Sequence, residues 1–207
     1  MLEEQRSRLE FNASLSSFMK WIDDHMETIR ADISIDKNDV EVQLKKHRNL
    51  QNEINAHTKY YDHLVKTGTE LVKTKKIEAL RDPVEKLKKT WKDLLIAANN
   101  KMLKLDHADA YQSFRVKLNQ VNYQFSKIKN ALSVEIDDSS LASLHLCAKE
   151  QKKTKKDISF VTLKVEELCA TGKVMIGYQH SASHDIEQQL KIVQEELINL
   201  KVINQTI

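Results

Sequence analysis

Apolar residues recur along the first thirty positions at alternating intervals of four and three. They are Phe11, Leu15, Phe18, Ile22 and Ile29, and His25 lies in the same register. This spacing puts about one side chain per turn on the same side of an α-helix, as in helices that pack into coiled-coil bundles. We therefore predict a long amphipathic helix that ends at the turn-forming segment 32–37.

Two further helices follow. Asn38 with Glu41 three residues later is a capping-box pattern and predicts the start of the second helix. Asp82 as N-cap and Pro83 at the first helical position predict the start of the third helix. The apolar series of the second helix is Leu44, His47, Ile54, Tyr61, Leu64, Gly68 and Leu71. That of the third is Leu87, Trp91, Leu94 and Ala98.

The third helix has no stop signal, because no glycine or proline occurs from position 84 to position 171. The apolar series then resumes as Phe114, Leu118, Val121, Phe125, Ile128 and Leu132. The simplest interpretation is one continuous helix from Pro83 to about Leu132. The segment 106–110 is poor in large apolar residues, so a break there is the alternative.

The chain also repeats itself. Segment 64–71 has a counterpart in segment 168–175, which aligns Leu64 with Leu168 and Gly68 with Gly172 at an offset of 104 residues. An offset of 103 aligns the series that begins at Phe11 with the one that begins at Phe114, and also relates the third helices. In the second unit the series are Leu141, Leu144, Ala148, Ile158, Val165, Leu168 and Met175, and then Leu190, Val193, Leu197 and Leu200. We predict an all-α fold of two tandem three-helix coiled-coil bundles, residues 1–104 and 105–207, that share a long continuous linker helix.

Composition supports this fold class. The chain has 3 glycines and 1 proline in 207 residues, where an average globular protein would have about 25. Too few tight turns are available for a β-sandwich or a dinucleotide-binding fold. The net charge of +3 does not demand a nucleic acid as partner. The chain starts without a signal-like apolar region and contains no membrane-spanning stretch, so we expect a cytoplasmic location without membrane insertion.

Candidates for chemistry are few. His180 and His184, with Asp185 adjacent, are the best metal candidates, but they lack a third ligand, and a solvated turn is expected. Cys147 and Cys169 are expected to be buried thiols, since neither has a spaced histidine partner. We therefore predict a protein that is not an enzyme and holds no metal or cofactor.

The three-helix unit of about 104 residues resembles the spectrin repeat. Trp21 and Trp91 stand where that family places its core tryptophans, and the second helix, with segment 39–42, His47 and segment 64–71 around Gly68, is similar to the family's second helix. The second unit departs from the pattern, with Gln194 in the slot of Trp91 and Gln124 or Phe125 in the slot of Trp21. The expected structural core comprises Trp21, Trp91, Leu64, Gly68, Leu168 and Gly172.

The resemblance implies a function. Spectrin repeats build cytoskeletal rods, so the chain is expected to be a piece of a giant linker that acts as elastic spacer and docking platform. Nesprin-like rods are favoured, with dystrophin, plakin and spectrin rods left open. Such a rod would join actin-associated proteins to another structure such as the nuclear envelope, and would lie on the cytoskeleton or at the outer nuclear membrane. The alternatives are a dedicated module that binds an actin regulator and a rod that dimerises side by side, a monomer being the expectation.

A lysine cluster is the best docking candidate. It consists of Lys149, Lys152, Lys153, Lys155 and Lys156 on the second helix of the second unit. Such a cluster suits an acidic protein, an acidic filament or an anionic lipid, whereas a merely solvated helix face is the alternative. The periodicity assigns Gln151 and Lys155 to the apolar seam, which would weaken this bundle. Tyr60, Tyr111 and Tyr123 are further candidates for an exposed patch.

Overall fold

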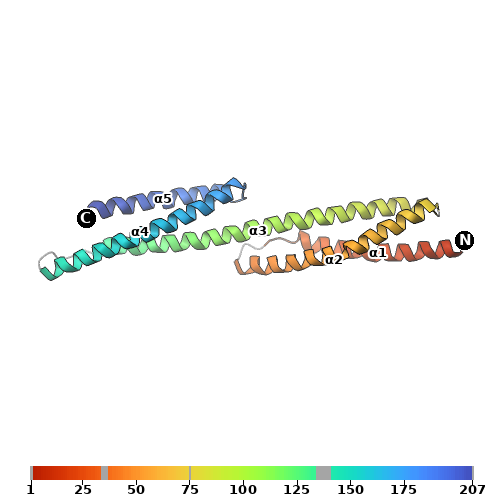
Figure 1. The fold of residues 1–207 in the computed structure, drawn as a ribbon, viewed down its shortest axis with the longest axis horizontal. Helices are drawn as coiled ribbons and strands as arrows, with labels where there is room; N and C mark the ends of the chain where they lie inside the picture. Colours follow the sequence, from red (N-terminus) through yellow and green to blue (C-terminus); the bar gives the residue numbers. More distant parts are fainter. Residues whose placement is uncertain (1, 34–36, 75, 134–140, 207) are drawn as a thin grey trace. The chain divides into compact units, whose positions relative to one another are not determined.

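The computed structural model describes residues 2–33, 37–74, 76–133 and 141–206, and all regular structure in these ranges is helical (Figure 1). The all-α prediction is therefore confirmed. The elements are α1 (Leu2–Arg30), α2 (Lys37–Thr74), the short 3-10 helix η1 (Glu78–Leu80), α3 (Arg81–Leu132), α4 (Leu141–Gly177) and α5 (Ser183–Thr206). The turn expected in the second unit at 134–140 lies outside the described residues, as do the side chains of Asn38, Leu141, Leu144 and Cys147.

Helix α3 runs for 52 residues without interruption, so the alternative of a break at 106–110 is wrong. The chain divides into two compact units, Met1–Asp109 and Ala110–Ile207, and the boundary between them lies within α3. One helix thus supplies the third helix of unit 1 and the first helix of unit 2.

Unit 1 is built around the apolar faces of α1, α2 and the first part of α3. Its core includes Phe11, Leu15, Phe18, Ile22, Ile29, Leu50, Ile54, Leu64, Leu71, Leu80, Val84, Leu87, Trp91, Leu94 and Ala98. A smaller cluster of Val40, Leu44 and Leu105 closes one end of the unit. Trp91 is buried as expected, but Trp21 is only half-buried and packs against the edge of the core, because its ring lies beside the face of α1 that carries the seam.

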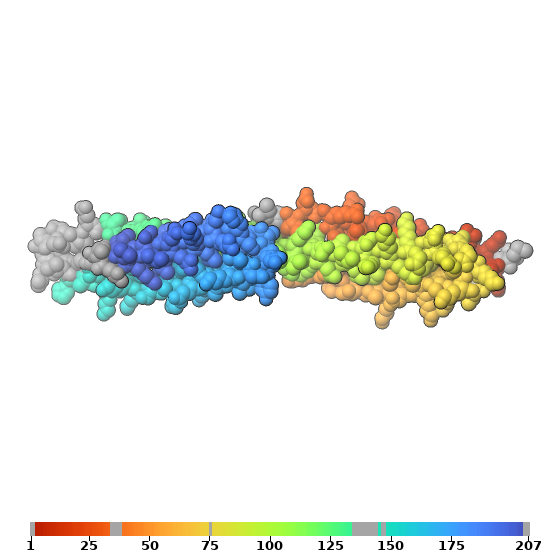
Figure 2. Space-filling view, turned by 90° about the horizontal axis from the view of Figure 1, so that it is seen from above, coloured from red at the N-terminus to blue at the C-terminus, as the bar shows by residue number. Residues whose placement is uncertain are grey.

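Unit 2 joins the second part of α3 to α4 and α5, and Figure 2 shows α4 and α5 side by side in this unit. Its core includes Phe114, Leu118, Val121, Phe125, Ile128, Ile158, Val161, Val165, Leu168, Cys169, Met175, Ile186, Leu190, Val193, Leu197 and Leu200. The apolar series predicted for α3 and α5 therefore lie in the core. On α4, however, Ala148 is exposed, so the seam prediction is wrong at this position.

The predicted helix starts are displaced by one or two residues. Helix α2 begins at Lys37, so Asn38 lies in its first turn rather than before it. Helix α3 begins at Arg81, directly after η1, whose Leu80 is buried in the core and anchors the entry. Pro83 still lies in the first turn, where backbone N–H groups lack partners within the helix, so its missing donor carries no penalty.

The two matched glycines occupy close approaches between helices. A β-carbon added at Gly68 would lie 2.5 Å from Cγ2 of Val84 and 2.7 Å from Cζ of Phe11. One added at Gly172 would lie 2.8 Å from Cδ1 of Leu190 and 3.0 Å from Cγ2 of Ile186. The shortest distance at each position is below 3.0 Å, which real β-carbons essentially never show, so a side chain at either position would force its neighbours to shift.

The third helices of the two units are related by a larger offset than predicted. Buried residues follow the same spacing in Leu80, Val84, Leu87, Trp91 and Leu94 and in Ile186, Leu190, Val193, Leu197 and Leu200. Leu197 therefore takes the slot of Trp91, and Gln194, which is exposed, does not. The cause is a longer turn: Leu80 follows Leu71 by nine positions, whereas Ile186 follows Met175 by eleven.

Candidate functional site

The slot of Trp21 distinguishes the two units. In unit 1 the Trp21 ring lies 5.6 Å from that of Phe18, 4.2 Å from that of His57 and 6.5 Å from that of Trp91, between centroids. In unit 2 the 103-residue offset puts Val121 in place of Phe18 and Gln124 in place of Trp21. Phe125, the other candidate for this slot, is buried in the core and corresponds to Ile22.

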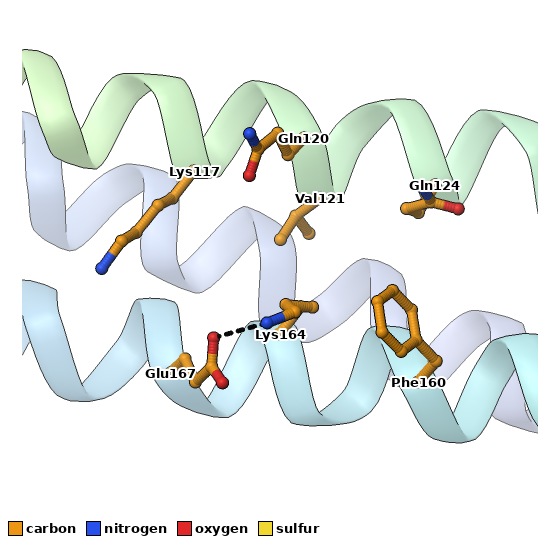
Figure 3. Close-up of a pocket in the computed structure, with 7 residues that line it drawn as sticks. All are labelled: Lys117, Gln120, Val121, Gln124, Phe160, Lys164 and Glu167. Carbon is orange, nitrogen blue, oxygen red and sulfur yellow. Dashed lines mark hydrogen bonds and ion pairs between the residues drawn. The ribbon is translucent and has the colours of Figure 1, made fainter.

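These smaller side chains leave a groove between α3 and α4. The groove has a volume of about 270 Å³ and is lined by Lys117, Gln120, Val121 and Gln124 from α3 and by Phe160, Lys164 and Glu167 from α4 (Figure 3). Val121 is 2% exposed and forms an apolar floor, whereas the Phe160 ring on α4 is 52% exposed. The groove therefore has apolar surface on both of its walls.

The lysine cluster continues from this groove along α4. With about 100° per residue, Lys149, Lys153 and Lys156 lie within about 40° of Phe160 around the helix axis, as does Lys164 on the other side. Lys152 lies about 80° from Phe160, and Lys155 about 140°. We use the name basic stripe for Lys149, Lys153, Lys156 and Lys164.

The seam of α4 does not pass through the lysine cluster. All five lysines are exposed, including Lys155, so the expectation that Lys155 occupies a seam position is wrong. The buried position is Thr154, which is 6% exposed and whose Oγ1 donates a hydrogen bond to the carbonyl of Glu150 at 2.9 Å. Gln151 is half-buried. This bond satisfies the buried hydroxyl, so Thr154 can face the core while the lysines on the other sides of α4 face solvent.

Both walls of the groove carry positive charge. Segment 110–132 of α3 contains four basic residues and no acidic one, and segment 149–167 of α4 contains six lysines and four acidic residues. Lys153 pairs with Glu150 at 3.4 Å and Lys164 with Glu167 at 2.9 Å, and the Lys164 ammonium lies 5.7 Å from the centre of the Phe160 ring. Lys149 and Lys156 form no ion pair with any residue in the described ranges.

The histidines predicted as metal candidates do not converge. His180 is 6% exposed, and its Nδ1 accepts a hydrogen bond from the backbone N–H of Ala182 at 2.9 Å. His184 is exposed and contacts Gln188. Asp185 accepts a hydrogen bond from the hydroxyl of Tyr111 at 2.5 Å. Among the described residues no cluster of three or more His, Cys, Asp or Glu side chains could hold a metal ion.

The other candidates have structural surroundings. Cys169 is buried, and this burial raises the pKa of its thiol above the ordinary value, which disfavours the thiolate that a nucleophile needs. Tyr111 is half-buried against Phe114 and His180 and belongs to no exposed patch, whereas Tyr60 and Tyr123 are exposed. Phe160 is the residue that sequence reasoning missed. Phe160 follows Lys156, Lys153 and Lys149 by 4, 7 and 11 positions, and this spacing could have shown that it lies on the same side of α4 as the stripe.

Comparison with known proteins agrees with this geometry in unit 1. Residues 6–107 match the spectrin repeat family, and this range covers α1, α2 and the part of α3 that lies in unit 1. Unit 1 thus matches the spectrin repeat over almost its whole length. The chain is also similar to the mouse (Mus musculus) protein Spectrin alpha chain, erythrocytic 1, with 22% identity over 138 residues. This alignment covers 65% of the chain but only 6% of that relative.

These matches support the predicted superfamily and its structural, cytoskeletal character. They give no support to nesprin over the other rods. None of the described helices has a stretch apolar and long enough to cross a membrane.

Proposed function

We propose that this chain is a segment of a cytoskeletal scaffold in which unit 2 is a second, divergent spectrin repeat. The support for unit 2 is its three-helix core, the seam of α3 that repeats the spacing of α1, and Gly172 at the helix approach that Gly68 makes in unit 1. Residues 1–104 and 105–207 are then the two repeats, apart from the exact boundary within α3.

The proposed activity is mechanical: the segment acts as a semi-rigid spacer. The observation that carries this proposal is the continuity of α3, which supplies core residues to both units. Unfolding of one unit would have to terminate a helix in the middle, so we expect the two units to stabilise each other. The exposed faces then remain available for docking other proteins.

A proline in α3 tests this coupling. Ala108→Pro removes one backbone hydrogen bond and introduces a clash, which destabilises a helix interior by about 3 kcal/mol or more. Both tryptophans lie in unit 1, so tryptophan fluorescence follows unit 1 alone, whereas circular dichroism follows both units. In the parent chain we expect both signals to change at the same urea concentration. In Ala108→Pro we expect the two transitions to separate.

Ala108→Ser is the control, because it alters the half-buried contact of Ala108 with the small cluster but keeps the helix. Its two transitions should coincide. If the transitions of the parent chain are already separate, or if Ala108→Pro unfolds like the parent, the units are independent and the spacer mechanism is wrong.

A dedicated interaction module is the second candidate, and the groove beside the basic stripe favours it. The finer assignments belong to the proposal as well: a nesprin-like parent protein, actin regulators as partners, and a link to the nuclear envelope. They rest on the lysine-rich second unit and its lack of tryptophan. A monomer is the proposed state, and sedimentation equilibrium at several concentrations tests it against a side-by-side dimer.

A further inference from the structure

We propose that the groove between α3 and α4 of unit 2 binds an acidic amphipathic helix of another protein. This inference deepens the docking role proposed above and names the chemistry of the partner. It requires a surface with positive charge, an apolar contact and the length of a helix, and each of the three is present at this site.

The charge selects an acidic partner. The chain as a whole has a net charge of only +3, yet residues 110–132 and 149–167, which include both groove walls, carry ten basic and four acidic residues. Lys149 and Lys156 have no carboxylate partner among the described residues, and the pairs of Lys153 and Lys164 are exposed and within one helix. Exposed pairs of this kind contribute little stability, so a partner carboxylate can replace either one at small cost.

The groove also favours a partner that has a large apolar side chain. In unit 1 the Trp21 ring fills the corresponding slot, against Phe18 and His57. In unit 2 Gln124 leaves the slot open above the buried side chain of Val121, with the exposed Phe160 ring at its margin. One large aliphatic or aromatic side chain of the partner would cover both residues and remove apolar surface from water.

The length of the basic stripe favours a helical partner. Lys149 and Lys164 are separated by about 22 Å along α4, at about 1.5 Å per residue, which equals about four turns. A partner helix lying along α4 would present carboxylates to the stripe at intervals of three and four residues and its apolar face to the groove. This is the helix-in-groove mode of recognition.

Unit 1 is an internal control for the surface. The offset of 104 residues puts Lys45, Asn49, Asn52, Ala56 and Tyr60 at the positions of the basic stripe and Phe160. Only one of these five carries a charge, and Trp21 fills the slot beside them. We therefore expect the helix to bind unit 2 and not unit 1.

The binding test uses two fluorescein-labelled peptides of about 20 residues, a length that covers the stripe at about 1.5 Å per residue. One is an amphipathic helix with glutamates on one face and leucine and phenylalanine on the other. The second has the same composition in an order without amphipathic period. Fluorescence anisotropy with the full chain should show binding of the first peptide, at least about tenfold weaker binding of the second, and weakening with salt.

Four variants locate the site. Gln124→Trp restores the residue of unit 1 and closes the groove, so it should weaken binding at least about tenfold while the fold is kept. Lys149→Glu combined with Lys153→Glu and Lys156→Glu should abolish binding. Lys155→Glu, on another side of α4, and Lys45→Glu, in unit 1, should leave the affinity within about twofold. Thermal unfolding by circular dichroism verifies that each variant is folded.

Three results would overturn the proposal. The first is equal binding of both peptides, and the second is an effect of Lys155→Glu as large as that of the stripe variants. Either would mean attraction by charge alone. The third is sedimentation of the chain with phosphatidylserine vesicles that the helical peptide does not prevent. This result would identify a lipid surface as the ligand instead. The coupling of the two units in the Ala108→Pro experiment is independent of all three, so the spacer function can stand or fail separately.

Discussion

Units 1 and 2 bury residues of their first helix at the same spacing, and they differ at one position beside this row of buried residues. The first helix of each unit buries side chains at the same spacing, from Phe11 to Ile29 in unit 1 and from Phe114 to Ile128 in unit 2. Beside this seam, unit 1 has Trp21 in a cluster of aromatic rings, and unit 2 has Gln124 at the edge of an open groove. The position of Trp21 is thus filled by an aromatic ring in unit 1, and its counterpart in unit 2 borders a groove, while the fold is the same.

The charges of the two faces differ as well. Residues 7–30 of α1 contain four acidic and three basic residues, whereas their counterparts in unit 2, residues 110–133, contain four basic residues and no acidic one. Charged residues on a solvated helix face contribute little to bundle stability, so they are free to vary. The two units therefore have similar cores, whereas the α3–α4 face of unit 2 is more basic than the α1–α2 face of unit 1.

The largest expected effect concerns the buried tryptophan of unit 1. Trp91 is 4% exposed, and its ring lies 4.9 Å from that of Tyr61 and 5.6 Å from that of Phe18. Trp91→Ala should lower the free energy of unfolding by about 3–5 kcal/mol in urea titrations. Trp21→Ala should cost less, because that ring is half-buried. An equal or larger effect of Trp21→Ala would mean that the aromatic cluster, rather than the seam, holds unit 1 together.

The matched glycines give the next effect. Gly68→Ala should destabilise the chain by about 2 kcal/mol, since the new methyl group meets Val84 and the stiff Phe11 ring. Gly172→Ala should be milder, because its nearest contact is the flexible end of Leu190. Gly177→Ala is the control. Nothing lies within 4 Å of its added β-carbon, so the higher helix propensity of alanine should stabilise the chain by up to about 1 kcal/mol.

Thermal unfolding of these three variants ranks them. If Gly68→Ala and Gly172→Ala both behave like Gly177→Ala, the helices tolerate a methyl group at the close approaches, and the repeated glycines have no packing role.

Hydrogen exchange should distinguish the two second helices. Residues 148–157 of α4 should exchange about tenfold faster than residues 44–53 of α2, a difference of about 1.4 kcal/mol in opening free energy. The reason is that Leu44 is buried and Ala148 exposed, while Leu50 corresponds to the polar Thr154. Mass spectrometry of peptic fragments measures both segments at once. Residues 161–172, which carry a continuous apolar seam, should be protected like residues 57–68. Uniform rates across α2 and α4 would contradict the comparison.

The smallest effect is a gain in stability. Gln124→Trp should raise the free energy of unfolding of unit 2 by about 1 kcal/mol, because the indole would cover Val121 and fill the groove. The reverse change, Trp21→Gln, should lower that of unit 1 by a similar or larger amount. If Gln124→Trp instead destabilises unit 2, the groove is too shallow for an aromatic ring and the slots are not equivalent.

Several features followed from the sequence alone. Periodicity of three and four residues placed Phe11, Phe18 and Phe114 in the cores, and the lack of glycine and proline predicted the continuity of α3. The internal repeat singled out Gly68 and Gly172 before their contacts were known. Such signals are local: each depends on residues of one helix, and the geometry of a helix converts their spacing directly into a face.

The tertiary structure decided the features that depend on two helices at once. The longer turn before α5 shifted its register, so that Leu197 and not Gln194 corresponds to Trp91. The rotation of α4 turned Lys155 outward and buried Thr154. The groove exists because Gln124 and Phe160 face each other across α3 and α4. Spacing along one helix cannot determine which side chain of the next helix lies opposite, because turn length and helix rotation set that pairing.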